Sequence, residues 1–146
     1  MSSPVATLAP MRADDYDDVT ALWRRSNGVG VRPDETREWF RRYLARNSGL
    51  SWTARIEERI AGAVLGGHDG RRGYLYHLAV AEEAQRRGIG GALVRATLAS
   101  LADDGITRAT IFVYGDNGAG KDFWRSLGWS SRLDLEVLQY DLASRG

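Results

Sequence analysis

Glycine and arginine are concentrated in the stretch 85–91, which has the sequence QRRGIGG. The stretch follows an apolar run that ends at Val80 and precedes helix-forming residues that begin at Ala92. A helix N-terminus leaves backbone N–H groups without partners and carries partial positive charge. Glycine lets an anionic group approach that backbone closely, and arginine adds charge and forked donors. The stretch therefore predicts a phosphate or pyrophosphate site.

The glycine-rich stretches have three other interpretations. The first is a tight strand-to-helix turn with solvated arginines. The second is a dinucleotide fingerprint, but this needs Gly or Ala where the chain has Leu93. The third is a P-loop at 115–122, GDNGAGKD, which would make the protein a nucleotide kinase using Lys121. Asp122 disfavours it, because a carboxylate stands where Ser or Thr would hold magnesium.

The bulk composition excludes several classes of protein. The 146 residues contain no cysteine and two histidines, which excludes disulfides and a cysteine nucleophile and predicts no metal site. The net charge is +1, so broad attraction to nucleic acid or to a membrane is not expected. The first ten residues do not resemble a signal peptide, and no apolar run approaches the ~18 residues of a membrane span. A cytoplasmic protein is expected.

Two helices are predicted near the N-terminus. Asp14 is expected to cap a helix over 14–25, because apolar residues recur behind it at helical spacing. Pro33 is expected in the first turn of the next helix, with Glu35 and Glu38 as its early acidic residues.

Alternating and continuous apolar runs predict the strands. Two runs on either side of 57–59 predict a hairpin, and 68–73 predicts a second turn. The remaining predicted elements are a short strand within 1–10, a strand at 74–80, a helix at 89–102, a strand at 106–114, a short helix at 121–127 and a closing strand at 133–142. The order β-α-α-β-β-β-α-β-α-β predicts one mixed α/β domain over 1–146.

Two motifs carry a resemblance to a known family. The sequences LAVAEEAQRRGIGGALV at 78–94 and NGAGKDFWRSLGW at 117–129 resemble those of the GNAT acetyl-CoA-dependent N-acetyltransferases. The similarity covers nearly the whole chain, since the predicted element order is also that of the GNAT acyl-CoA N-acyltransferase fold. The turn GGHDGRRG resembles a small bacterial branch, the YpeA-like acetyltransferases, whose members mostly lack a known substrate.

The resemblance implies a site for acetyl-CoA. Strands 74–80 and 107–114 would separate to admit the pantetheine arm, and the short helix 119–127 would pack against it. The backbone before the turn would pair with this arm as with an extra strand, and the amides of the turn would bind the pyrophosphate. The cofactor-binding residues implied are Leu78, Ala79, Val80, Gln85, Arg86, Arg87, Gly88, Ile89, Gly90, Gly91, Asn117 and Trp124.

The expected catalytic residues are Tyr76, Tyr114 and Trp124. Acetyl transfer to an amine needs a base for the amine, an N–H donor for the carbonyl oxygen and an acid near the sulfur. By family analogy, the N–H donor is the backbone of Val80. Many members have Tyr as the acid where this chain has Trp124, and an indole donates a hydrogen bond but releases no proton. Trp124 would then only steady the sulfur, with Tyr114 or water as the acid.

The base is sought on strand 74–80, where side chains alternate. Tyr74, Tyr76 and Leu78 are expected on one face, and Leu75, His77 and Ala79 on the other. Family members with a base on this strand place it at the position of Tyr76, which predicts that Tyr74 and Tyr76 line the pocket and order a water.

Other polar residues have competing interpretations. His77 would point away from the pocket and be structural. His68 and Asp69 are the other candidates for binding a cationic acceptor or relaying a proton, although Asp69 also suits a plain hairpin turn. The loop 27–32 and the helix after it are where the family shapes its acceptor site.

These inferences together predict a GNAT acetyltransferase. It would transfer acetyl from acetyl-CoA to a primary amine by direct attack in a ternary complex. The acceptor would be a small amine, an antibiotic-like polyamine or a protein N-terminus. A CoA-binding sensor or structural module with little turnover is the alternative, and the sequence leaves a homodimer open.

Overall fold

The computed structural model describes residues 5–143, so the first four residues of the predicted N-terminal tail lie outside the described residues. Contacts divide the chain into two compact units. The first ends at Tyr114 and the second begins at Gly115. We describe each unit by itself, and the expectation of a single domain stays a prediction.

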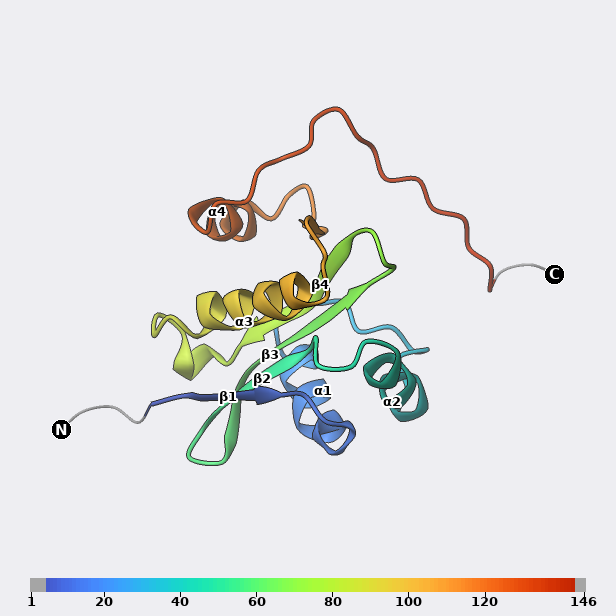
Figure 1. The fold of residues 1–146 in the computed structure, drawn as a ribbon. Helices are drawn as coiled ribbons and strands as arrows, with labels where there is room; N and C mark the ends of the chain where they lie inside the picture. The colour runs from blue at the N-terminus through green and yellow to red at the C-terminus, as the bar shows by residue number, and fades with distance from the viewer. Residues whose placement is uncertain (1–4, 144–146) are drawn as a thin grey trace. The chain divides into compact units, whose positions relative to one another are not determined.

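A five-stranded mixed sheet forms the centre of the first unit (Figure 1). Its strands follow chain order, and neighbours among the first four are antiparallel, whereas the fifth runs parallel to the fourth. Helix α3 covers one face of the sheet, and α1 and α2 lie on the other. The strands are β1 (Thr7–Pro10), β2 (Trp52–Ile56), β3 (Arg59–His68), β4 (Gly73–Val80) and β5 (Ala109–Thr110).

Helix α1 (Tyr16–Arg24) begins after a 3-10 turn at Ala13–Asp15, and not at a cap formed by Asp14. The prediction of Asp14 as the N-cap is wrong, because the residue that directly precedes the helix is Asp15. Its carboxylate accepts a hydrogen bond of 2.8 Å from the backbone N–H of Arg12. The helix buries Val19, Thr20, Leu22 and Trp23 against the sheet.

Helix α2 (Arg37–Arg46) begins later than predicted, which corrects the placement of Pro33 and Glu35 in its first turn. The hydroxyl of Thr36 accepts from the backbone N–H of Trp39 at 3.2 Å and caps the helix. Pro33 instead lies in a turn closed by the hydrogen bond from Glu35 N to the carbonyl of Arg32, and Pro suits that position because its φ is preset.

Both predicted hairpins are confirmed. The turn between β2 and β3 uses Glu57 and Glu58 with φ of 50° and 70°, the left-handed backbone that a two-residue hairpin turn requires. The second turn joins β3 to β4 at His68 and Gly73. The strand predicted at 74–80 and the helix predicted at 89–102 are confirmed as β4 and α3 (Ile89–Asp103).

Large side chains of α3 pack on glycines of the sheet. A Cβ at Gly73 would lie 2.7 Å from a methyl of Leu101, and a Cβ at Gly62 would lie 2.9 Å from one of Leu93. Leu93, Thr97 and Leu101 are fully or almost fully buried. The missing side chains let the helix approach the strands closely, and this contact forms the main core.

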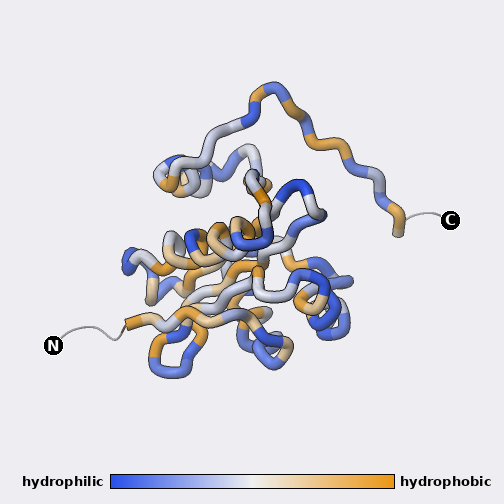
Figure 2. Tube along the Cα trace, in the orientation of Figure 1, coloured by the Kyte–Doolittle hydropathy of each residue, from blue (hydrophilic) through white to orange (hydrophobic). Residues whose placement is uncertain are grey.

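Two predicted strands differ from the structure. The strand expected at 106–114 is limited to Ala109–Thr110. The closing strand expected at 133–142 is wrong, because none of these residues belongs to a strand. The alternating apolar pattern, visible along this segment in Figure 2, predicts a strand only where a neighbour supplies hydrogen bonds. Its large apolar side chains are exposed instead: Leu133, Leu135, Val137, Leu138, Tyr140 and Leu142.

Helix α4 (Gly118–Ser126) belongs to the second unit and begins before the predicted 121–127. Asn117 caps it by accepting from the backbone N–H of Gly120 at 2.9 Å. The observed order is β-α-α-β-β-β-α-β-α, which is the predicted order without its last strand. The predicted mixed α/β fold class is confirmed.

Gly66 provides a test of this packing. A Cβ there would collide with the backbone carbonyl oxygen of Leu50 and lie 2.7 Å from a methyl of Thr97. We expect Gly66→Ala to lower the free energy of unfolding by about 3 kcal/mol, since backbone cannot yield as a flexible side chain does. Gly115→Ala is the control, because nothing lies within 4 Å of its Cβ position. Equal urea unfolding midpoints for the two variants would contradict the close packing.

Candidate active site

The strands β4 and β5 hydrogen-bond only where they begin. Gly73 pairs with Ala109 and Tyr74 pairs with Thr110, and the ladder then ends. Beyond Tyr74, β4 continues to Val80 with β3 as its one strand neighbour among the described residues. The separation that the resemblance implies is therefore present, and the far edge of β4 keeps backbone donors and acceptors for a further extended chain.

A β-bulge interrupts β4 on its other edge, where the strand pairs with β3. Ala63 pairs with Ala79 and Leu65 pairs with Tyr76, so Val64 alone faces the two residues between them on β4. The first of these, His77, has φ of 56°, in the left-handed region that residues other than glycine rarely adopt. The bulge changes the direction of β4 just before Val80.

The bulge overturns the predicted alternation of side chains. Tyr74 pairs with Gly67, whose Cβ position faces Tyr43 of α2, so Tyr74 and Tyr76 lie on the α1–α2 side. His77 lies on this side too, because its ring is 5.1 Å from that of Trp23 on α1. The prediction that His77 points to the opposite face is wrong.

Leu78 also changes face. Val80 pairs with Gly62, whose Cβ position faces Leu93 of α3. Leu78 is two residues before Val80 and by alternation shares the α3 side, with Ala79 on the other. The faces predicted for Leu78 and Ala79 are thus exchanged, since the extra residue of the bulge shifts the alternation by one.

Three aromatic rings gather where β4 and β5 separate. Tyr74, Tyr76 and Phe112 stack with centroid distances of 5.9, 6.0 and 6.4 Å. Tyr76 is 37% exposed and Phe112 57% exposed, so the rings present a surface. Burial, and then the neighbouring Tyr74, raise the pKa of Tyr76. Its phenol therefore stays protonated at neutral pH, where it can order a water but cannot serve as a phenolate base.

Tyr43 of α2 lies behind these rings. Its hydroxyl is buried and has no hydrogen-bond partner among the described residues. Burial, and then Tyr76, raise its pKa well above the usual 10. A Cβ at Gly67 would lie 2.7 Å from this hydroxyl, so the sheet leaves it no room for a water on that side.

The loop between α1 and α2 reaches the same region. A Cβ at Gly30 would lie 3.4 Å from the hydroxyl of Tyr114, an exposed residue that follows β5. The loop 27–32 and the expected catalytic Tyr114 are therefore neighbours.

The glycine-rich turn opens α3 with unoccupied amides. Gly88 is the N-cap with φ of 77°, no side chain caps the helix, and its first turn contains no acidic residue. Arg86 also has a left-handed backbone, and 85–88 are exposed. Gln85 donates from Nε2 to the carbonyl of Val80 at 3.3 Å and ties the turn to the end of β4. These features fit an anionic group.

His68 and Asp69 lie at the other end of β4, where β3 turns back. His68 Nε2 is 3.0 Å from a carboxylate oxygen of Asp104, and its Nδ1 accepts from Gly70 N–H. Asp69 accepts from the backbone N–H groups of Arg71 and Arg72, which lower its pKa. The hydrogen bonds of Asp69 therefore match the interpretation as a plain hairpin turn. The structure does not bring His68 or Asp69 to Tyr76.

The second unit holds the remaining expected residues. Asn117 caps α4, and Trp124 packs with its ring centroid 5.3 Å from that of Phe123 and 5.0 Å from that of Trp129. Lys121 donates from Nζ to the carbonyl of Gly115. The lysine that suggested a P-loop is therefore bonded within its own loop.

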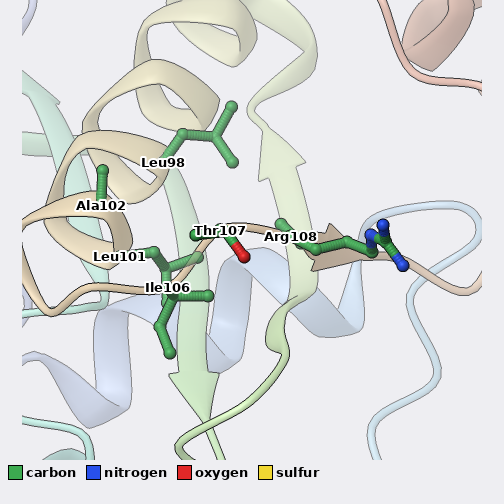
Figure 3. A pocket seen from close by; sticks show the side chains of 7 residues that line it. Leu98, Leu101, Ala102, Ile106, Thr107 and Arg108 are labelled. Carbon is green, nitrogen blue, oxygen red and sulfur yellow. The ribbon is translucent and has the colours of Figure 1, made fainter.

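A separate apolar pocket of about 210 Å³ lies at the C-terminal end of α3 (Figure 3). This is the opposite end of the helix from the glycine-rich turn, so the pocket is not part of the candidate site. Its lining residues are Leu98, Leu101, Ala102, Ile106, Thr107, Arg108 and Ala109.

Within 5–143, no group of His, Asp and Glu side chains could hold a metal ion, and no helix is long and apolar enough to cross a membrane.

The split sheet and the uncapped helix after it agree with the comparisons with known proteins. The family model described as the acetyltransferase (GNAT) family matches residues 16–129. An acetyltransferase of Photorhabdus laumondii is 34% identical over 129 residues, which cover 87% of this chain and 88% of the relative. The chain belongs to the GNAT family and is an acetyltransferase of that type.

Solved structures share the fold at low identity. The aminoglycoside N-acetyltransferase AAC(6′)-Iy in complex with CoA has a TM-score of 0.78 and 14% identity, covering 96% of both chains. The ribosomal-protein-S18-alanine N-acetyltransferase from Escherichia coli has a TM-score of 0.68 and 17% identity, covering 85% of this chain and 77% of its own. At these identities the likeness concerns the fold alone.

Sequence reasoning missed Glu35 and Phe112 as members of this region. Phe112 was counted only as part of a strand, and Glu35 only as an acidic residue near a helix start. Glu35 meets His77 across 42 positions of the chain, a contact for which no local pattern gives a signal.

The buried phenol of Tyr43 predicts a pH dependence of stability. Because its folded pKa is raised, the neutral phenol stabilises the fold below pH ~10, and this contribution is lost above that pH as the unfolded chain ionises. Tyr43→Phe should change the free energy of unfolding by less than about 1 kcal/mol at pH 8, because the hydroxyl has no partner to lose. At pH 10.5 it should be the more stable protein.

Urea unfolding at the two pH values measures this difference. Tyr16→Phe is the control, since the Tyr16 hydroxyl donates to the carbonyl of Glu35 at 3.1 Å and its loss should weaken the fold at both pH values. An equal alkaline loss in wild type and Tyr43→Phe would contradict the assignment.

Proposed function

We propose that this acetyltransferase transfers the acetyl group of acetyl-CoA to a primary amine by direct attack in a ternary complex. The observation that carries the proposal is the free edge of β4, which is followed, after a 3-10 turn at Glu82–Ala84, by the uncapped N-terminus of α3. An extended pantetheine chain can pair with such an edge, and a diphosphate suits the amides that follow.

The residues that would hold the cofactor form a continuous path. Backbone groups of Leu78, Ala79 and Val80 would pair with the pantetheine arm. The amides from Arg86 to Gly91 would bind the diphosphate, and the guanidinium groups of Arg86 and Arg87 would add charge. Gln85 supports this path, because it bonds the carbonyl of Val80 from within the turn. The sequence resemblance alone extends the proposal to Asn117 and Trp124.

The chemistry at the thioester is divided among a few groups. Acetyl-CoA would supply an activated acetyl group. The N–H of Val80 is proposed to donate to the carbonyl oxygen, where negative charge develops. Tyr76, whose raised pKa keeps it a phenol, would order the water that takes the amine proton. Tyr114 would serve as the acid for the sulfur, with Trp124 as a hydrogen-bond donor only.

The acceptor site is proposed to lie over the exposed rings of Tyr76 and Phe112, beside the loop 27–32. Aromatic faces attract an ammonium group, which is how an amine arrives at neutral pH. A small amine or a protein N-terminus both satisfy this requirement. The fold neighbours named above include an aminoglycoside N-acetyltransferase and a ribosomal-protein-S18-alanine N-acetyltransferase. Neither nucleic acid nor membrane is proposed as a partner.

The direct test is thiol release from acetyl-CoA across a panel of small amines and N-terminal peptides. We expect release that depends on the amine and saturates with its concentration. A reaction without amine and one with the protein heat-denatured are the controls. Binding of CoA by calorimetry with no amine-dependent release from any acceptor would instead favour the alternative, a CoA-binding module.

Gly88 provides a test of the diphosphate site. Gly88→Glu would place negative charge in the open space before α3, and we expect the Kd for CoA to rise at least 10-fold. Gly49→Glu is a matched control, because Gly49 has the same φ of 77° and equally open surroundings, but lies in the turn between α2 and β2. Similar calorimetric affinities for the two variants would remove the turn from the cofactor site.

A further inference from the structure

We propose that Glu35 and His77 form a clamp that holds the loop between α1 and α2 against the bulge of β4, and that this clamp positions the reactants for transfer. The inference rests on the proposed function, because it assigns the residues after the bulge to the thioester. It makes Glu35 and His77 positioning residues and not catalytic ones.

The contact between the two side chains is close and sheltered. His77 Nε2 lies 2.9 Å and 3.0 Å from the two carboxylate oxygens of Glu35. The side chains are only 15% and 14% exposed. The edge-on ring of Trp23 fixes the imidazole from a third direction. Among the described contacts between acidic and basic side chains, this is the most buried one.

The bulge needs such a partner. A residue other than glycine in the left-handed region costs on the order of 1–3 kcal/mol, and it persists where its surroundings over-determine it. Glycine would adopt this backbone freely, but would have no side chain to reach Glu35. The backbone of His77 therefore has an unfavourable φ, but its side chain makes a contact with Glu35 that couples the bulge to the loop.

Glu35 in turn holds the loop. Its carbonyl accepts from the hydroxyl of Tyr16 at 3.1 Å, and its carboxylate accepts from the backbone N–H of Arg32 at 3.4 Å. The same loop reaches Tyr114 at Gly30. The Glu35 side chain thus links the loop, which borders the proposed acceptor surface, to His77. His77 in turn sets the direction of Leu78–Val80.

This arrangement predicts an effect on transfer that spares the cofactor. The glycine-rich turn follows the end of β4 and is tied to it through Gln85 and Val80, not through His77. Loss of the clamp should leave the diphosphate site intact. It should loosen the alignment between amine and thioester, to which reaction rates are very sensitive.

The experiment compares Glu35→Gln, Glu35→Ala, His77→Asn and the double variant Glu35→Ala/His77→Asn. Asparagine tolerates the left-handed backbone but is too short to keep the contact. Glu38→Gln is the matched control, because Glu38 lies three residues after Glu35, in the first turn of α2, and pairs with Arg41 on the exposed surface. For each variant, kcat and KM for the best amine, the Kd for CoA and the thermal midpoint are measured.

We expect Glu35→Ala and His77→Asn each to lower kcat at least 10-fold, with the Kd for CoA within about 2-fold of wild type. The double variant should be no slower than the worse single variant, since both changes break one contact. Glu35→Gln should retain more activity, because its amide oxygen still accepts from Nε2. Unchanged kcat, multiplicative losses, or an equal loss in CoA affinity would overturn the proposal. Activity restored by raising the pH would make the pair a base, and would also overturn it.

Hydrogen exchange provides a readout that does not need activity. In folded Glu35→Ala, amides of 27–36 and 77–80 should exchange faster together, and those of 88–92 should keep their wild-type protection. Faster exchange in one segment alone would overturn the clamp. If wild type acetylates no amine but the two segments respond together, the proposed function fails while the physical coupling stands.

Discussion

The structure depends on one backbone constraint, which is that β4 pairs with β3 from Gly73 to Val80, apart from the bulge, but with β5 only at Gly73 and Tyr74. Buried backbone N–H and C=O groups need partners, so an edge left open in the middle of a sheet has to be exposed or to bind something. The chain keeps the edge open because the strand after α3 leaves the ladder at Thr110. The exposed edge, the ring cluster and the glycine-rich turn then follow one another along a single strand and the helix it leads into.

The bulge at His77 gives that edge its direction. Without it, β4 would present Leu78 on the same side as Tyr76, and its last residues would continue the line of the strand. With it, the polar and aromatic groups of the α1–α2 side, namely Tyr74, Tyr76 and His77, are gathered together. Leu78 and Val80 turn toward α3. A single extra residue thus separates the stacked aromatic surface from the strand end that precedes the glycine-rich turn.

Family membership and site chemistry carry different information here. The fold and the turn are properties that the chain shares with the GNAT family. On the α1–α2 side, the sheet combines stacked rings, a buried phenol without a partner among the described residues and a sheltered carboxylate–imidazole pair. A shared fold does not by itself fix a function, which depends on the particular residues of the site.

Local sequence determined the elements whose physics is local. The glycine-rich turn, both hairpins, β4 and α3 could be predicted because turn residues and apolar spacing act over a few positions. The starts of α1 and α2 were predicted too early. Asp15 and Thr36, and not Asp14 and Pro33, stand directly before the two helices and form the hydrogen bonds there. Tertiary structure alone decided the bulge at His77, its contact with Glu35 and the absence of a strand at 133–142. Each of these depends on a partner distant along the chain, and no pattern within one segment records what will lie beside it in space.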